Sequence, residues 1–181
     1  MGLNIAGIAI NKSYKEDVST IESMLGHQLL FEKEVPFEEA CESFKEDSYC
    51  DIYFSENSTF ILCDMERAGF EFILEEQDVF SFVLSEMTMT FCINYVKNGK
   101  LVRTIVEAED ELHEDEGTPL EFEKTEDDKS EIIYYLIEKT IGKSFDDIDL
   151  EATCKRYTFQ SLQQSDTTET NGSKKPWWKF W

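Results

Sequence analysis

The sequence predicts an α+β domain built on a single twisted, mostly antiparallel sheet of about six or seven strands. Short apolar or alternating segments recur between residues 49 and 107, an Asn-Gly pair joins two of them, and helical periodicities lie near both ends of the chain. With 181 residues, 41% of them hydrophobic and 13% aromatic, the chain can bury one sizeable core. We expect two or three helices packed on one face of the sheet.

The N-terminal segment alternates between strand and helix patterns. Residues 4–10, NIAGIAI, are almost entirely apolar and predict a buried first strand. Residues 11–26 predict a helix, because Ser13 and Glu16 have the spacing of a capping box. Residues 28–35 return to a strand pattern.

The next segments are a short helix and a hairpin. Pro36 can open a helix, since its missing N–H costs nothing at the first helical position. Residues 49–54 and 59–64 are strand-like and flank the polar residues 55–58, which predicts a hairpin.

The middle of the chain carries the strongest strand signals. Residues 69–74 and 79–84 each predict a short alternating strand. Residues 88–96 and 101–107 flank Asn98-Gly99, whose residues accept the positive φ angles of a type I′ turn. That turn predicts a register with these cross-strand pairs: Tyr95 with Val102, Ile93 with Thr104, Phe91 with Val106 on one face, and Asn94 with Arg103 on the other.

The C-terminal part begins with a hydrophilic connection, residues 107–128. Residues 128–142 predict a helix that starts at Asp128 and ends at Gly142. Residues 154–159 predict a short edge strand. The chain therefore divides into a globular domain, residues 1–162, a polar linker, residues 163–173, and a basic-aromatic tail, residues 174–181.

Charge restricts the classes of ligand. The net charge of −22 argues against nucleic acid, because phosphate backbones select clusters of lysine and arginine. It permits a basic protein partner, attracted over long range, although the simpler interpretation is that the charge only keeps the chain soluble and monomeric. The five cysteines show no C-x-x-C spacing, and the first residues do not have the pattern of a signal peptide. We therefore expect a cytoplasmic protein with reduced thiols.

Motifs for catalysis and cofactor binding are weak. An EF-hand frame started at Leu112 fails, because leucine cannot be the first calcium ligand. Residues 142–144, Gly-Lys-Ser, lack the partner glycine of a P-loop and follow a helix. Two histidines and widely spaced cysteines do not suggest a zinc site or a nucleophile pair. We predict no catalytic residue, no metal and no cofactor.

Two segments are candidates for partner binding. The first is an acidic surface at the start of the hydrophilic connection: Glu107, Glu109, Asp110, Glu111, Glu114, Asp115 and Glu116. The second is the tail, with Lys174, Lys175, Trp177, Trp178, Lys179, Phe180 and Trp181. All three tryptophans of the chain lie in this tail, which could dock on a partner protein, on its own domain or on a membrane surface.

One stretch resembles a pattern in small uncharacterised bacterial proteins. It comprises the strand segments 82–96 and 102–110, then Glu116-Gly117-x-Pro119-Leu120-x-x-Glu123, an EG-x-P-L-x-x-E motif, and a helix that ends near residue 148. The similarity covers about residues 80–150. Some of these proteins are similar in size and acidity to immunity proteins of bacterial toxin systems, so the resemblance implies a binding role and no activity.

The leading interpretation is a non-enzymatic bacterial protein whose acidic body masks a basic protein partner, with the tail as a second docking element. Two alternatives stay open. One is a carboxylate- or metal-dependent enzyme, and the other is a peripheral membrane adaptor that uses the tryptophan-rich tail. The oligomeric state does not follow from the sequence.

Overall fold

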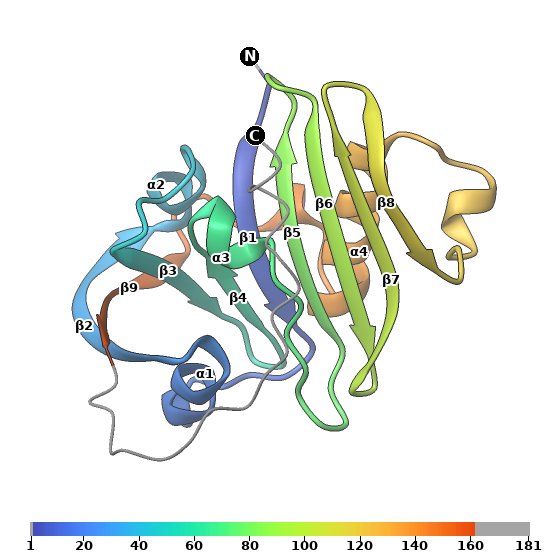
Figure 1. Ribbon diagram of the computed structural model, residues 1–181. Coiled ribbons are helices and arrows are strands. Elements are labelled where there is room, and N and C mark those ends of the chain that lie inside the picture. The colour runs from blue at the N-terminus through green and yellow to red at the C-terminus, as the bar shows by residue number, and fades with distance from the viewer. Residues whose placement is uncertain (1, 162–181) are drawn as a thin grey trace.

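A computed structural model describes residues 2–161 (Figure 1). Within them, nine strands form one sheet in the order β2-β9-β3-β4-β1-β5-β6-β7-β8, and each neighbouring pair is antiparallel. The predicted α+β class with one mostly antiparallel sheet is confirmed. The predicted six or seven strands and two or three helices are too few, since the described residues hold nine strands and four α-helices.

The elements have the following bounds. The strands are β1 (Asn4–Ile10), β2 (His27–Pro36), β3 (Tyr49–Phe54), β4 (Thr59–Leu62), β5 (Val79–Ser85), β6 (Thr90–Lys97), β7 (Lys100–Ala108), β8 (Glu111–Gly117) and β9 (Thr153–Ser161). The helices are α1 (Val18–Leu25), α2 (Phe37–Cys41), α3 (Met65–Ala68) and α4 (Lys129–Ile141), with short 3₁₀ turns at Phe122–Lys124 and Phe145–Asp147.

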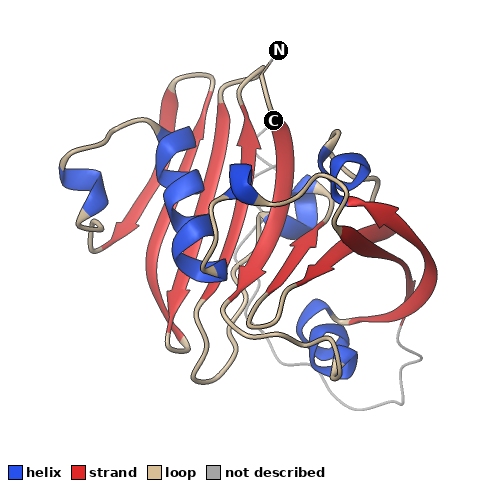
Figure 2. Ribbon diagram, turned by 180° about the vertical axis from the view of Figure 1, so that it is seen from behind, coloured by secondary structure: helices blue, strands red, loops and turns tan. Residues whose placement is uncertain are grey.

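Helices cover both faces of the sheet, so the prediction of helices on one face is wrong. In β1, Ile5 and Ala9 point into the core under α4 and α2, whereas Ile8 and Ile10 point into the core under α1 and α3. We call these two sides the α4 face and the α1 face. Figure 2 views the sheet from the α4 face, with α4 lying in front of the strands. A strand with apolar side chains on both sides needs cover on both sides, and β1 and β5 are such strands.

The helix ends follow local chemistry. The Asp128 carboxylate accepts a hydrogen bond from the Ser130 backbone N–H, so α4 begins where the sequence predicts. Helix α1 is shorter than predicted, because residues 11–17 are not helical. Instead of capping a helix, the Ser13 hydroxyl donates to the Ser55 carbonyl oxygen.

The β6–β7 hairpin has the predicted turn but a different register. Asn98 and Gly99 both have positive φ, 49° and 73°. An irregularity next to Tyr95 shifts the pairing by one residue, so Arg103 lies opposite Tyr95 rather than Asn94. The predicted pairs were therefore wrong, and the shift places Arg103 on the α4 face.

Three further segments differ from prediction. The predicted edge strand 154–159 belongs to β9, which lies inside the sheet between β2 and β3. Residues 69–74 are not a strand, although Phe72 and Leu74 pack against the core of the α1 face. The hydrophilic connection 107–128 contains a strand, β8. The edges of the sheet are β2 and β8, which lie at opposite sides in Figure 1.

Candidate functional site

The predicted acidic surface lies on the β7–β8 hairpin, at one edge of the sheet. Glu107 is near the end of β7, Glu109 and Asp110 form the turn, and the other four carboxylates are in β8. Glu109 and Asp110 both have positive φ, 52° and 63°, so the turn is tight. The structure thus brings together all seven carboxylates of the predicted surface.

Strand β8 is an exposed edge strand. All seven of its residues are exposed, and within residues 2–161 the ladder pairs it with β7 alone. The β7–β8 pairing has a bulge-like irregularity, a shift of register between Val106 and Glu107. Edge strands commonly carry charges and bulges of this kind, which prevent uncontrolled pairing with other chains.

The register distributes the β8 side chains between the two faces. Glu111, Glu114 and Glu116 lie opposite Ala108, Val106 and Thr104, and therefore on the α1 face. Leu112 and Asp115 lie opposite Glu107 and Ile105, on the α4 face. The paired residues on the α1 face are thus all acidic, and those on the α4 face combine one carboxylate with an exposed leucine.

Two of the seven carboxylates have partners on the α4 face. Asp115 forms an ion pair with Arg103, and a carboxylate oxygen of Glu107 lies 3.6 Å from Nζ of Lys129. The negative charge of these two residues is therefore partly offset. Glu109, Asp110, Glu111 and Glu114 are exposed to solvent.

The EG-x-P-L-x-x-E stretch encloses Arg103. Its last residue, Glu123, accepts hydrogen bonds from Nε and Nη2 of Arg103, the latter at 2.7 Å, and from the Leu120 N–H at 2.9 Å. The Glu116 carbonyl oxygen accepts a further bond from Nη1. The guanidinium is buried, and its hydrogen bonds with Glu123 raise the pKa of Arg103. In this chain the motif therefore has a structural role, fixing the loop after β8 to β7.

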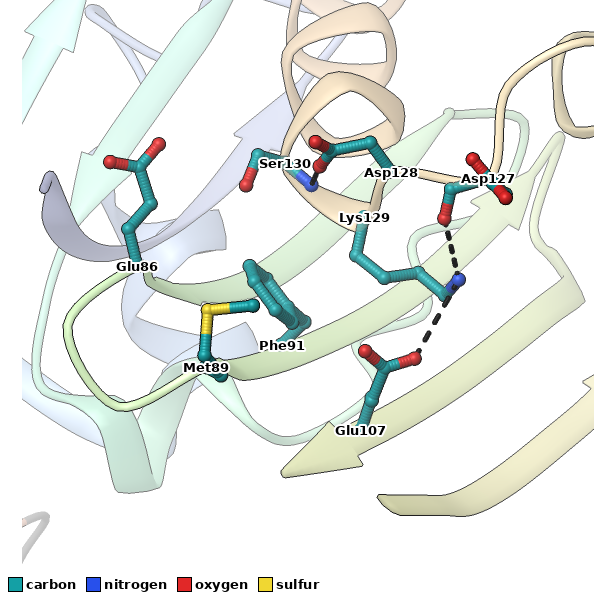
Figure 3. A pocket seen from close by; sticks show the side chains of 8 residues that line it. All are labelled: Glu86, Met89, Phe91, Glu107, Asp127, Asp128, Lys129 and Ser130. Carbon is teal, nitrogen blue, oxygen red and sulfur yellow. Dashed lines mark hydrogen bonds and ion pairs between the residues drawn. The ribbon is translucent and has the colours of Figure 1, made fainter. Parts of the chain in front are cut away.

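A hollow of about 450 Å³ lies beside the acidic hairpin, at the first turn of α4 (Figure 3). Its lining residues are Glu86, Met89, Phe91, Glu107, Asp127, Asp128, Lys129 and Ser130. Several polar groups are already bonded within the protein. The Glu86 carboxylate accepts from the Leu3 N–H, and Nζ of Lys129 donates to the Asp127 carbonyl oxygen. The hollow therefore extends the acidic surface without forming a reactive pair.

Burial raises the pKa of all five cysteine thiols above the ordinary value. Burial raises the pKa of Cys92 and of Cys154 to about 12, which disfavours their thiolates. His27 begins β2 and His113 is in β8, at opposite edges of the sheet. In the described part of the chain, no group of three or more His, Cys, Asp or Glu side chains is placed to hold a metal ion. No helix among residues 2–161 is long and apolar enough to cross a membrane.

Sequence reasoning missed a buried ion cluster under α2. Asp51 in β3 is fully buried and accepts hydrogen bonds of 2.7 and 2.8 Å from Nε and Nη2 of Arg156 in β9. Nζ of Lys45 lies 3.2 Å from the same carboxylate, and Nη1 of Arg156 lies 3.1 Å from Glu39. The available signal was Asp51, the single charge in the otherwise apolar β3, whereas β9 carries two adjacent charges, Lys155 and Arg156. With its hydrogen bonds satisfied, the cluster joins β3 to β9.

The tail, residues 174–181, lies outside the described residues, so its predicted partner contacts remain predictions. Comparison of the chain with protein-family models, with curated proteins and with solved structures finds no match.

Proposed function

We propose that this protein is a non-enzymatic binding module whose acidic β7–β8 edge masks a basic protein partner, as an immunity protein masks a toxin. The observation that carries the proposal is the position of β8. Its acidic side chains lie on an exposed sheet edge, where a partner can approach without any rearrangement of the core. The net charge of −22 would attract a basic partner over long range.

The tail is proposed as a second docking element. Its lysines and tryptophans combine charge with large apolar area, and the preceding polar linker lets both elements bind one partner. Because every tryptophan of the chain lies in the tail, its selectively excited tryptophan emission reports on this element alone when the partner contains no tryptophan. A blue shift of the emission on addition of the captured partner supports the docking role, and unchanged emission contradicts it.

The test is quantitative capture of partners from native lysate at low and high sodium chloride. The edge variant, Glu111→Lys with Glu114→Lys, is compared with a control variant, Glu32→Lys with Glu34→Lys. The control makes the same change of charge on exposed residues of β2, the opposite edge.

We expect basic proteins to be captured by the wild type and by the control at low salt, and to be lost from the edge variant and at high salt. Equal capture by all three proteins would remove β8 from the interface. Capture of no basic protein by the wild type at either salt concentration would contradict the proposed function.

A further inference from the structure

The open edge of β8 offers main-chain groups as well as charge. In an antiparallel ladder, every second residue directs its N–H and C=O groups away from the neighbouring strand. The seven residues of β8 are exposed, and within residues 2–161 the sheet pairs this strand with β7 on one side only. Such an edge can accept an additional strand, which supplies affinity through main-chain hydrogen bonds.

The charges on β8 restrict which strand can pair with it. A second copy of β8 would place carboxylates beside carboxylates, and like charges on adjacent strands are destabilising. A strand with lysine or arginine would instead gain cross-strand pairs of opposite charge. The carboxylates that disfavour pairing of β8 with a second copy of β8 therefore favour pairing with a basic segment.

The register adds a pattern to this selection. Glu111 and Glu114 lie on the α1 face, whereas on the α4 face Asp115 is already paired with Arg103 and Leu112 is 55% exposed. A complementary strand would place basic side chains on the α1 face and apolar side chains over Leu112. Since successive residues of a strand point to opposite faces, its sequence would alternate between basic and apolar residues.

We propose that β8 is the docking site for an extended segment of the basic partner, which joins the sheet as an additional antiparallel strand and alternates lysine or arginine with apolar residues. This inference rests on the proposed function and specifies its mode of binding. It names Glu111 and Glu114 as the residues that select the basic side chains and Leu112 as the apolar contact.

The experiment uses the full chain and three synthetic peptides of identical charge. The first peptide alternates lysine and valine, the second has the same composition with lysines and valines in separate blocks, and the third is the alternating peptide with its inner backbone nitrogens methylated. Calorimetry gives the affinities, and hydrogen exchange monitored by mass spectrometry gives the protection of residues 111–117 and of β2.

We expect the alternating peptide to bind and to slow exchange in β8 but not in β2. The methylated peptide is expected to bind about tenfold more weakly or worse, because it cannot donate main-chain hydrogen bonds. The block peptide should also lose affinity. Glu111→Lys with Glu114→Lys should abolish binding of the alternating peptide, and Glu32→Lys with Glu34→Lys should leave it unchanged.

Other outcomes separate the two proposals. Equal binding of all three peptides without protection of β8 would leave an acidic docking surface but would overturn strand addition. If no peptide bound but basic proteins were still captured in a salt-sensitive manner, the acidic docking surface would likewise stand and strand addition would be overturned. Binding of the alternating peptide only after deletion of residues 174–181 would assign this edge to the chain's own tail and overturn the partner proposal.

Discussion

Arg103 shows how one buried charge depends on its acceptors. Its side chain is 5% exposed, and Glu123, which is 10% exposed, provides its bidentate partner. Glu123→Gln should lower the free energy of unfolding by about 2–3 kcal/mol, because a buried guanidinium loses a charged hydrogen-bond acceptor. Urea denaturation measures this loss.

The matched control is Glu121→Gln in the same turn. Glu121 is 85% exposed and pairs with Lys124, so its replacement should change the free energy of unfolding by less than about 0.5 kcal/mol. If both variants lost the same free energy, Glu123 would have no special role in holding Arg103.

The buried thiol of Cys92 should make the stability of the protein depend on pH. Burial raises the pKa of its thiol from 9.0 to about 12. The folded state therefore keeps a proton that the unfolded state releases. This contribution to stability is fully present below pH 9 and is lost as the pH rises toward 12, at about 1.4 kcal/mol per pH unit.

Urea unfolding of the wild type and of Cys92→Ala across this alkaline range tests the prediction. Cys92→Ala should lose stability less steeply with rising pH, whatever its stability at neutral pH. Parallel pH profiles for the two proteins would show that the Cys92 thiol does not contribute.

The resemblance placed the strand segment that contains Arg103 shortly before the motif that ends at Glu123, but the sequence could not identify the two residues as partners. The predicted register placed Arg103 opposite Asn94, on the other face. A single irregularity beside Tyr95 reverses that assignment, since a shift of one residue moves a side chain to the opposite face. No pattern in the residues near Tyr95 predicts this irregularity.

At the scale of elements, Gly117 determines how β8 ends. Its φ of 91° is strained for other residues, and an added Cβ would overlap the Val102 carbonyl oxygen. Gly117→Ala should therefore destabilise the protein by about 1–3 kcal/mol and accelerate amide exchange in β8.

Gly99→Ala provides the comparison for Gly117→Ala. Gly99 has a similar positive φ of 73°, but the nearest atom to an added Cβ is 3.3 Å away. Its substitution should cost less and should not accelerate exchange in β8 selectively. A larger loss for Gly99→Ala than for Gly117→Ala would contradict the assignment.

The Asp51 cluster joins β3 to β9, and its members should differ in how much their replacement lowers the free energy of unfolding. Asp51→Asn leaves Lys45 and Arg156 buried without their shared carboxylate and should cost about 3–5 kcal/mol. Lys45→Met keeps the bidentate Asp51–Arg156 pair and should cost much less. Chemical denaturation of the two variants measures the free energy of unfolding. A greater decrease for Lys45→Met than for Asp51→Asn would show that the lysine is the essential member.

Elements with a local signature were predictable, and the others were not. Asn98-Gly99 and Asp128 mark a turn and a helix start through short-range chemistry. Strand β8 has both faces exposed, so it lacks the apolar alternation that reveals a strand. The interior place of β9 depends on contacts such as Asp51 with Arg156, 105 residues apart, which no local pattern encodes.

At the scale of the whole molecule, a net charge of −22 should make stability depend on salt. Between about 0.01 M and about 1 M sodium chloride the Debye length falls from about 30 Å to about 3 Å, so mutual repulsion of the carboxylates weakens. The melting temperature should therefore rise over this range, as measured by circular dichroism.

The edge variant, Glu111→Lys with Glu114→Lys, separates repulsion from general effects of salt. Its smaller negative charge should give a smaller rise in melting temperature than that of the wild type. Equal rises for both proteins would show that the effect comes from exclusion of the salt from the protein surface rather than from charge repulsion. A falling melting temperature would contradict the prediction.

The strand order also has a consequence for biosynthesis. In the described sheet β2 pairs with β9 alone, although more than a hundred residues separate the two strands along the chain. As the polypeptide emerges from the ribosome, β2 appears early and has no neighbour until the residues of β9 follow. Its exposed Leu30 and Phe31 are then available to other chains. Where several nascent chains lie close together on one messenger RNA, β2 is therefore the strand most exposed to aggregation. Slow translation of the residues before β9 should lower the yield of native protein.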